Sequence, residues 1–304
     1  MIVLSGGTGT PKLLQGLRLL IPDEEITVIV NTAEDITVSG NLVTPDIDTV
    51  LYLFSGQLDD TKWWGIKDDT FRTYHALKKL GISEKLMIGD ADRAVHIFRS
   101  ELMRKGENLT EATLQLSRRL GIKARILPMC DEKVDTMIKT PQGFIHFQDF
   151  WVGARGETDV LGIHIEGIEG ARPTKVAIGV LSSEDNVIIG PSNPITSIGP
   201  ILALKGMRKI LEQKKVVAVS PIIGNAPVSG PAGKLMVASG FPVSSKGVAE
   251  CYGDILDILV IDQKDTIDEK DLEVRAVRCD TMMTSVEKSK AVAKNILELF
   301  RDIG

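Results

Sequence analysis

MIVLSGGTGTPKLL, residues 1–14, joins a short apolar run to a glycine-rich turn and then to a helix start. The apolar run Ile2–Leu4 is typical of a buried strand. The three glycines of the turn let the backbone bend tightly and approach a ligand without obstruction by side chains. Thr10 suits the N-cap of a helix and Pro11 its first position. Because the free N–H groups of a helix start attract anions, the segment predicts a phosphate-binding α/β protein.

The glycine-rich turn matches neither of the common phosphate-binding motifs. A dinucleotide fingerprint, G-x-G-x-x-G, needs a glycine where Lys12 stands, which weakens the case for an NAD-dependent oxidoreductase. A P-loop ends in Gly-Lys-Ser or Gly-Lys-Thr, whereas this turn ends in Pro-Lys-Leu. An ordinary tight strand–helix connection is the alternative to a ligand-binding loop.

Composition excludes several classes of protein. Hydrophobic residues make up 43% and charged residues 25% of the 304 residues, as in a soluble globular protein. A net charge of −5 and an aromatic content of 5% speak against nucleic-acid binding. No apolar stretch reaches the ~20 residues of a membrane helix, and Met1 leads into a strand without a leader. The three distant cysteines, Cys130, Cys251 and Cys279, suit a reducing cytoplasm and no zinc site.

Alternating strand and helix patterns predict an α/β fold, Rossmann-like, with a mostly parallel sheet flanked by helices. We expect one domain over residues 1–304, with a β-hairpin insertion or subdomain at approximately 130–170. The expected strands are Ile2–Leu4, Ile26–Val30, Leu86–Ile88, Ala124–Leu127, Val187–Ile189, Val216–Val219 and Ile255–Ile261. The expected helices are Asp46–Phe54, Thr70–Leu80, Ala91–Lys105, Leu109–Leu120, Ile201–Leu211 and Ser285–Arg301. Ligands of such sheets bind beyond the carboxyl ends of the strands, so we expect the functional residues in the loops that follow the strands.

Two D-x-D turns open predicted helices at such positions. Asp46 and Asp48 begin one helix, and Asp90 and Asp92, followed by Arg93, begin another. Paired carboxylates can hold Mg²⁺ together with substrate phosphate oxygens, or accept a proton. They can equally be helix caps that complement the helix dipole. The repetition of the spacing predicts a divalent-metal site.

The segment GPSNPITSIGP, residues 190–200, offers hydroxyl, amide and free N–H groups at another helix start. It predicts a second anion-binding loop, with a rigid turn as the alternative. Lys12 can approach a bound phosphate or stay in solvent. The histidines, His75, His96, His146 and His164, have no metal-ligand spacing, so a structural or surface role is expected for each.

Several motifs together resemble one family. They are LSGGTGTPKLLQG, NTAEDI, TPDIDTVLY, WWGIKDDTF, IGDADRA, LPMCDEKVDT, FQDFWV, IIGPSNPITSIGPIL and SPIIGNAPVSGPAGKLM, and they span nearly the whole chain in order. This set is similar to the archaeal CofD family of coenzyme F420 biosynthesis. The resemblance implies Mg²⁺-dependent transfer of a 2-phospholactyl group from lactyl-2-diphospho-5′-guanosine to the ribitol hydroxyl of the deazaflavin Fo. The products would be F420-0 and GMP.

The resemblance also implies roles for individual residues. Asp48 and Asp90 would be catalytic, and the deazaflavin would lie against Asp48, Met87, Asp90 and Arg93. The guanylated donor would bind at Gly6, Gly7, Thr8, Gly9, Thr10, Lys12, Ser192, Asn193 and Thr196. Mg²⁺ would be held by Asp46, Asp48, Asp90 and Asp92, with no separate assignment of base and metal ligand. The partners would be these small molecules and a second copy in a homodimer, while the donor's three-carbon unit, phospholactate or its phosphoenolpyruvate-derived analogue, stays open.

The alternative is a binding protein without catalysis. The YvcK-like family, which binds nucleotide-sugars as a regulator, resembles the glycine-rich start. The D-x-D turns and the FQDFWV segment favour the transferase.

Overall fold

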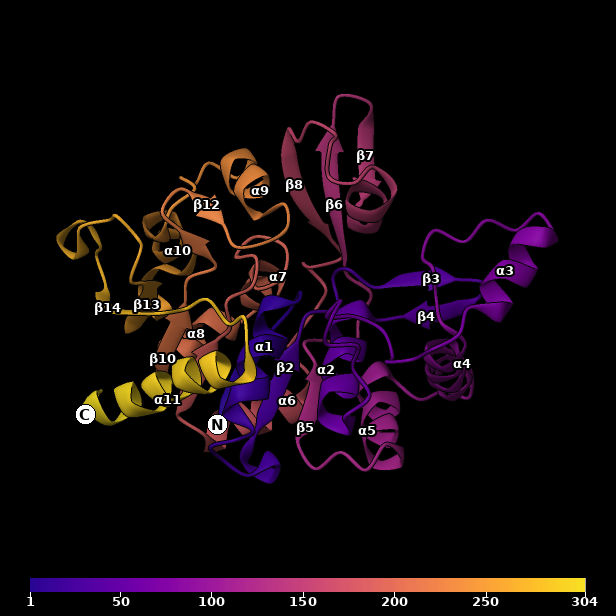
Figure 1. Ribbon diagram of the computed structural model, residues 1–304, viewed down its shortest axis with the longest axis horizontal. Coiled ribbons are helices and arrows are strands. Elements are labelled where there is room, and N and C mark those ends of the chain that lie inside the picture. The colour runs from indigo at the N-terminus through magenta and orange to yellow at the C-terminus, as the bar shows by residue number, and fades with distance from the viewer. Residues whose placement is uncertain (304) are drawn as a thin grey trace.

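Seven parallel strands form one central sheet in the computed structural model, which describes residues 1–303 (Figure 1). Their order is β14-β13-β10-β9-β1-β2-β5, and each neighbouring pair runs parallel. The prediction of a mostly parallel α/β sheet is confirmed. In chain order the strands are β1 (Ile2–Ser5), β2 (Thr27–Val30), β5 (Arg125–Pro128), β9 (Asn186–Ile189), β10 (Lys215–Val219), β13 (Ile258–Asp262) and β14 (Arg275–Cys279).

Helices cover both faces of this sheet, which is why its strands are nearly continuous apolar runs. Along β1, Ile2 and Leu4 point into one core and Val3 into the other, as the alternation of a strand requires. The core around Val3 is packed by α1 (Gly9–Leu17), α2 (Pro45–Ser55), α4 (Asp90–Arg104), α5 (Leu109–Arg119) and α11 (Val286–Asp302). The core around Leu4 is packed by α6 (Lys175–Ser183), α7 (Gly199–Ala203), α8 (Met207–Leu211), α9 (Ala232–Ala238) and α10 (Ser245–Tyr252).

A second, antiparallel sheet occupies the middle of the chain. It consists of β6 (Asp135–Thr140), β7 (Gly143–His146) and β8 (Gly162–Glu166), so the predicted hairpin is confirmed. A π-helical segment, η2 (Asp149–Gly153), follows β7. A small apolar cluster joins this sheet to Leu235 of α9, and Figure 1 shows the two side by side at the top of the molecule.

The remaining elements are short. The hairpin β3 (Ile36–Val38) and β4 (Asn41–Val43) extends away from the central sheet towards α3 (Arg72–Lys79), at the right of Figure 1. A two-stranded ladder, β11 (Ile222–Ile223) with β12 (Ala226–Pro227), precedes α9. Single 3-10 turns occur at η1 (Asp23–Glu25), η3 (Gly253–Ile255) and η4 (Glu269–Asp271). Within residues 1–303, no helix is both long and apolar enough to cross a membrane.

Several sequence-based boundaries were wrong. Residues 86–88 form no strand, so the second D-x-D turn does not end a strand of the sheet. Helix α1 begins at Gly9 with Thr8 as its N-cap, which places Thr10 inside the helix. The predicted helix 201–211 is split at Leu204, which has extended backbone angles, into α7 and α8.

The order of the strands in the central sheet indicates the edge where a ligand would bind. The chain runs outwards from β1 to β2 and β5 on one side, and β9 lies on the other side of β1. The order therefore reverses between β1 and β9, and such a switch point leaves a crevice beyond the carboxyl ends of the two strands. The loops that follow β1 and β9 are the two predicted anion-binding loops.

Candidate active site

A pocket of about 760 Å³ lies at this edge. Its wall comes from loops that follow five of the sheet strands, from the starts of α2 and α4, and from the η2 segment. Of the predicted site residues, it is lined by Gly7, Thr8, Gly9, Lys12, Asp46, Asp48, Met87, Asp92, Ser192, Asn193 and Thr196. The lining does not include Gly6, Thr10, Asp90 or Arg93.

The loops after β1 and β9 are hydrogen-bonded directly to each other. The Ser192 hydroxyl donates to the carbonyl oxygen of Gly6, and it lies 2.6 Å from the Thr10 hydroxyl. The backbone N–H of Thr10 donates to the same Ser192 oxygen over 3.3 Å. Gly6 and Thr10 thus join the two loops from behind, while Gly7, Thr8 and Gly9 face the pocket. The expected convergence of the two loops on one ligand has this geometric basis.

Asp46 is tied to the first loop. Its Oδ1 accepts the backbone N–H of Gly7 at 2.7 Å, and its Oδ2 accepts the Asn31 amide at 3.0 Å. Burial raises the pKa of Asp46 to about 6, although these two hydrogen bonds act in the opposite direction. Gly7 has a φ of +57°, a left-handed conformation that suits glycine.

Glu34, in the loop between β2 and β3, lines the pocket although no site role was expected for it from the sequence. It lines the pocket with a residue exposure of 6%, and its Oε1 has no hydrogen-bond partner among the described residues. Burial raises the pKa of Glu34 well above its ordinary value, and the neighbouring charge of Asp46 adds to the effect. The sequence did hold an indication of this role, because the acidic residues Glu34 and Asp35 of NTAEDI follow a predicted strand directly.

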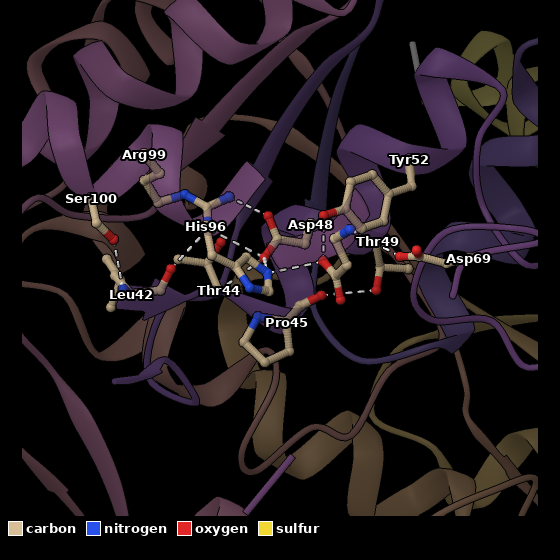
Figure 2. A network of polar contacts seen from close by, with 11 residues as sticks. Leu42, Thr44, Pro45, Asp48, Thr49, Tyr52, Asp69, His96, Arg99 and Ser100 are labelled. Carbon is tan, nitrogen blue, oxygen red and sulfur yellow. Dashed lines mark hydrogen bonds and ion pairs between the residues drawn. The ribbon is translucent and has the colours of Figure 1, made fainter. Parts of the chain in front are cut away.

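Asp48 lies in a buried network of charges (Figure 2). Its two oxygens accept the guanidinium of Arg99, which is 0% exposed, and its Oδ2 lies 3.1 Å from Nε2 of His96. Burial alone would raise the pKa of Asp48, but the charges of Arg99 and His96 hold it below its usual range. The partners of Asp48 therefore favour its ionised form, in which both oxygens accept hydrogen bonds.

His96 links Asp48 to Asp92. Its Nε2 lies 2.9 Å from Asp92 Oδ1, which also accepts the hydroxyl of Tyr52 over 2.5 Å. Burial acts to lower the pKa of His96, but its hydrogen bonds to the two carboxylates outweigh this and raise it to about 9. A structural or surface role was expected for His96, whereas the structure places it in the pocket wall. The available signal was the spacing of Asp92, His96 and Arg99, which places all three on one side of α4.

Asp90 and Arg93 do not reach the pocket. Asp90 accepts the Thr70 hydroxyl and the backbone N–H groups of Arg72 and Thr73, so it caps the start of α3. Arg93 forms a paired contact with Glu84, at 2.9 and 2.6 Å. Direct roles of these two residues towards the deazaflavin, and of Asp90 in catalysis or metal binding, therefore have no support in the geometry.

The four carboxylates of the two D-x-D turns do not gather around one point as expected, because Asp48 and Asp92 lie close together whereas Asp46 and Asp90 face elsewhere. Successive residues of a helix are rotated by about 100° about its axis, so residues two apart, rotated by about 200°, lie on nearly opposite sides. Asp46 accordingly faces Gly7, whereas Asp48 faces Arg99. The carboxylate and imidazole atoms that cluster within 4.8 Å are those of Asp48, Asp92 and His96. Within this cluster Asp48 already pairs with Arg99 and His96, and Asp92 pairs with His96, so basic side chains face both carboxylates.

Large apolar side chains form the other wall of the pocket. Trp64, Met87, Trp151 and Val152 line it and are 40–47% exposed. Met87 was expected to lie against the deazaflavin, and the structure places it in the pocket lining. Trp64 and Trp151 were not assigned to the site from sequence, although they belong to the WWGIKDDTF and FQDFWV motifs. Flat apolar surfaces of this kind suit an aromatic ring system.

A protein-family model matches almost the whole chain. The model of the family described as 2-phospho-L-lactate transferase CofD matches residues 1–297. The chain belongs to the CofD family. A CofD relative from Methanosarcina acetivorans, named 2-phospho-L-lactate transferase, is 60% identical over 99% of both chains. One of the same name from Methanocaldococcus jannaschii is 46% identical, covering 97% of this chain and 96% of its own. The CofD membership identifies a transferase of coenzyme F420 biosynthesis.

Solved structures show the same fold at much lower identity. A UPF0052 family protein from Bacillus halodurans superposes with a TM-score of 0.69 over 97% of this chain and 98% of its own. The two sequences are 15% identical, so the likeness concerns the fold alone.

Proposed function

We propose that this protein transfers the 2-phospholactyl group of lactyl-2-diphospho-5′-guanosine to the ribitol hydroxyl of Fo. The observation that carries the proposal is the set of surfaces that this 760 Å³ pocket brings together. It combines two joined anion-binding loops, buried carboxylates and an apolar wall with two tryptophans. A diphosphate donor and an aromatic acceptor with a polyol chain need these three surfaces side by side.

The reaction breaks the phosphoanhydride bond of the donor and forms a phosphate ester with the acceptor hydroxyl. GMP leaves, and the hydroxyl proton passes to a base. Such transfers depend mainly on positioning and on neutralisation of charge. Backbone N–H groups that have no acceptor among the described residues, those of Thr8 after β1 and Asn193 after β9, would bind the diphosphate. Asp48 would orient the acceptor hydroxyl, because Arg99 and His96 fix its position and its charge.

Among the carboxylates of the pocket, Glu34 and Asp46 fit a bound Mg²⁺ ion. They supply oxygen ligands beside the anion-binding loop, and Glu34 Oε1 has no partner among the described residues. Burial is the largest cause of the raised pKa of both carboxyl groups, and a bound cation would favour their ionised forms. When bound, the ion would neutralise the charge of the diphosphate.

The test of the function is direct. Purified protein is incubated with Fo, Mg²⁺ and the guanylated donor, and F420-0 and GMP are measured. We expect equimolar formation of both products. Binding of a nucleotide-sugar without any affinity for Fo would instead support the regulatory alternative. Parallel incubation with the phosphoenolpyruvate-derived donor determines which three-carbon unit is used. Light scattering of the same sample tests the proposed homodimer.

The metal site gives a second prediction. Glu34→Gln and Asp46→Asn should each raise the Mg²⁺ concentration for half-maximal rate by about tenfold or more, since each removes a charged ligand. Asp90→Asn is the matched control, because Asp90 caps α3 outside the pocket, and its metal requirement should stay within about twofold of wild type. Binding of Mn²⁺ alone, followed by its electron paramagnetic resonance signal, gives a readout independent of turnover. A changed requirement in Asp90→Asn with none in the other two would contradict the assignment.

A further inference from the structure

Lys12 is an unusual cation within this pocket. It lines the wall beside the glycine-rich turn, and its Nζ lies 5.3 Å from the centre of the Trp63 ring. Within residues 1–303, no ion pair or hydrogen bond joins this ammonium group to a carboxylate, and burial is the cause that lowers the pKa of Lys12. An aromatic ring is therefore the group that holds it.

A nearby lysine shows the contrast. Lys62 lies over the ring of Trp64 at 5.4 Å, but its Nζ also pairs with Asp59 at 2.8 Å. A carboxylate partner neutralises a lysine and competes with any anionic ligand for it. A ring attracts the cation through its quadrupole without neutralising it. Lys12 thus keeps its charge available to the pocket.

The backbone at Trp63 is strained to place this ring. Its φ is +63°, in the left-handed region that bulky residues rarely adopt. The surrounding loop enforces the conformation, because the Trp63 N–H donates to Asp59 O over 2.8 Å and the Asp59 N–H donates to Gly65 O over 3.1 Å. Leu58 and Ile66 form a β-bridge that closes the loop, and the ring packs against the core beside α1 and α2. Strain of this kind persists where the surroundings impose it, and it occurs at functional sites.

We propose that Trp63 is a positioning residue that holds Lys12 in the pocket as an unpaired cation for the diphosphate of the donor. This inference rests on the proposed function, since it requires an anionic ligand at the loops after β1 and β9. The ring fixes the direction of a long, flexible side chain before the ligand arrives. The entropy of ordering Lys12 is then lost on folding and not on binding, which strengthens the binding of the diphosphate.

The test uses GDP and inorganic pyrophosphate as probes, with binding measured by calorimetry. Lys12→Met should weaken both by about tenfold or more, through loss of the charged contact. Trp63→Leu should weaken both by about fivefold, because the cation–π contact is lost. Trp63→Phe keeps a ring and the same backbone conformation, so it should bind both probes nearly as well as wild type.

The double variant separates positioning from a general structural effect. If the ring acts through the lysine, Trp63→Leu should have no further effect in the Lys12→Met protein. Additive losses, or normal binding by Trp63→Leu, would overturn the inference while the proposed function stands. Failure of the wild-type protein to bind either probe would overturn both.

If the Trp63 variants do not fold, the contact between the ring and Lys12 can still be tested by NMR of the wild-type protein. In wild-type protein labelled with ¹³C at lysine Cε, ring-current shielding should shift the Hε signals of Lys12 and Lys62 upfield, because each lysine lies over a tryptophan ring. The spectrum of Lys12→Arg should lack one of these signals and keep the other. A wild-type spectrum that loses no upfield signal in Lys12→Arg would show that the Trp63 ring and Lys12 are not in contact.

Discussion

Asp48→Asn should lower the free energy of unfolding by about 3–5 kcal/mol, the cost of leaving a buried charge without its partner. Arg99 is 0% exposed and has Asp48 as its carboxylate partner, and His96 lies against the same carboxylate. An amide keeps the size of the side chain but removes the charge that both cations need. Since native proteins are stable by only about 5–15 kcal/mol, a loss of this size removes a large share of the total stability.

Urea unfolding followed by circular dichroism measures this loss. The double variant Asp48→Asn/Arg99→Met should regain part of the stability, because the buried guanidinium is then absent. Asp46→Asn is the comparison within the same helix turn, and it leaves no cation unpaired. An Asp48→Asn protein with the unfolding midpoint of wild type would contradict the network. Loss of turnover in Asp48→Asn is consequently no measure of its chemical role unless stability is measured beside it.

The sheet and its ligand-binding edge could be predicted from the sequence because both follow from local patterns. Runs such as Ile26–Val30, apolar except for Thr27, and Val216–Val219 are nearly continuous apolar segments, as is typical of strands covered on both faces. Loops rich in glycine and small polar residues follow β1 and β9. The last strand, β14, was missed because Arg275 and Arg278 interrupt its apolar pattern at the edge of the sheet.

The site itself could be predicted only in part, because side-chain direction decides it. Two identical D-x-D spacings have different outcomes: Asp46 faces the glycine-rich turn, while Asp90 caps a neighbouring helix. Which carboxylate faces the pocket depends on where each helix begins and on what packs beside it. The partners of Asp48 come from α4, 48 and 51 residues further along the chain, so no local pattern around Asp48 could indicate them.

Gly9 and Gly7 should respond very differently to the same substitution, although both belong to the glycine-rich turn. A Cβ at Gly9 would overlap the carbonyl oxygen of Pro191, on the loop after β9. The backbones of the two loops would have to separate, which would break the hydrogen bonds of Ser192 and Thr10. We expect Gly9→Ala to lower the free energy of unfolding by more than about 3 kcal/mol, the upper range for overpacking. Gly9→Val is expected to prevent folding altogether.

At Gly7 a Cβ would meet only the Ser197 hydroxyl, at 3.3 Å, so the main cost is the left-handed backbone at a φ of +57°. That cost is about 1–2 kcal/mol, and Gly7→Ala should remain folded. The added methyl group lies at the wall where the donor is proposed to bind, so GDP affinity should fall while Fo affinity is retained. Calorimetry with each ligand separately, on protein shown to be folded, tests this. Loss of Fo binding with normal GDP binding would mean that the glycine-rich turn holds the acceptor and not the donor.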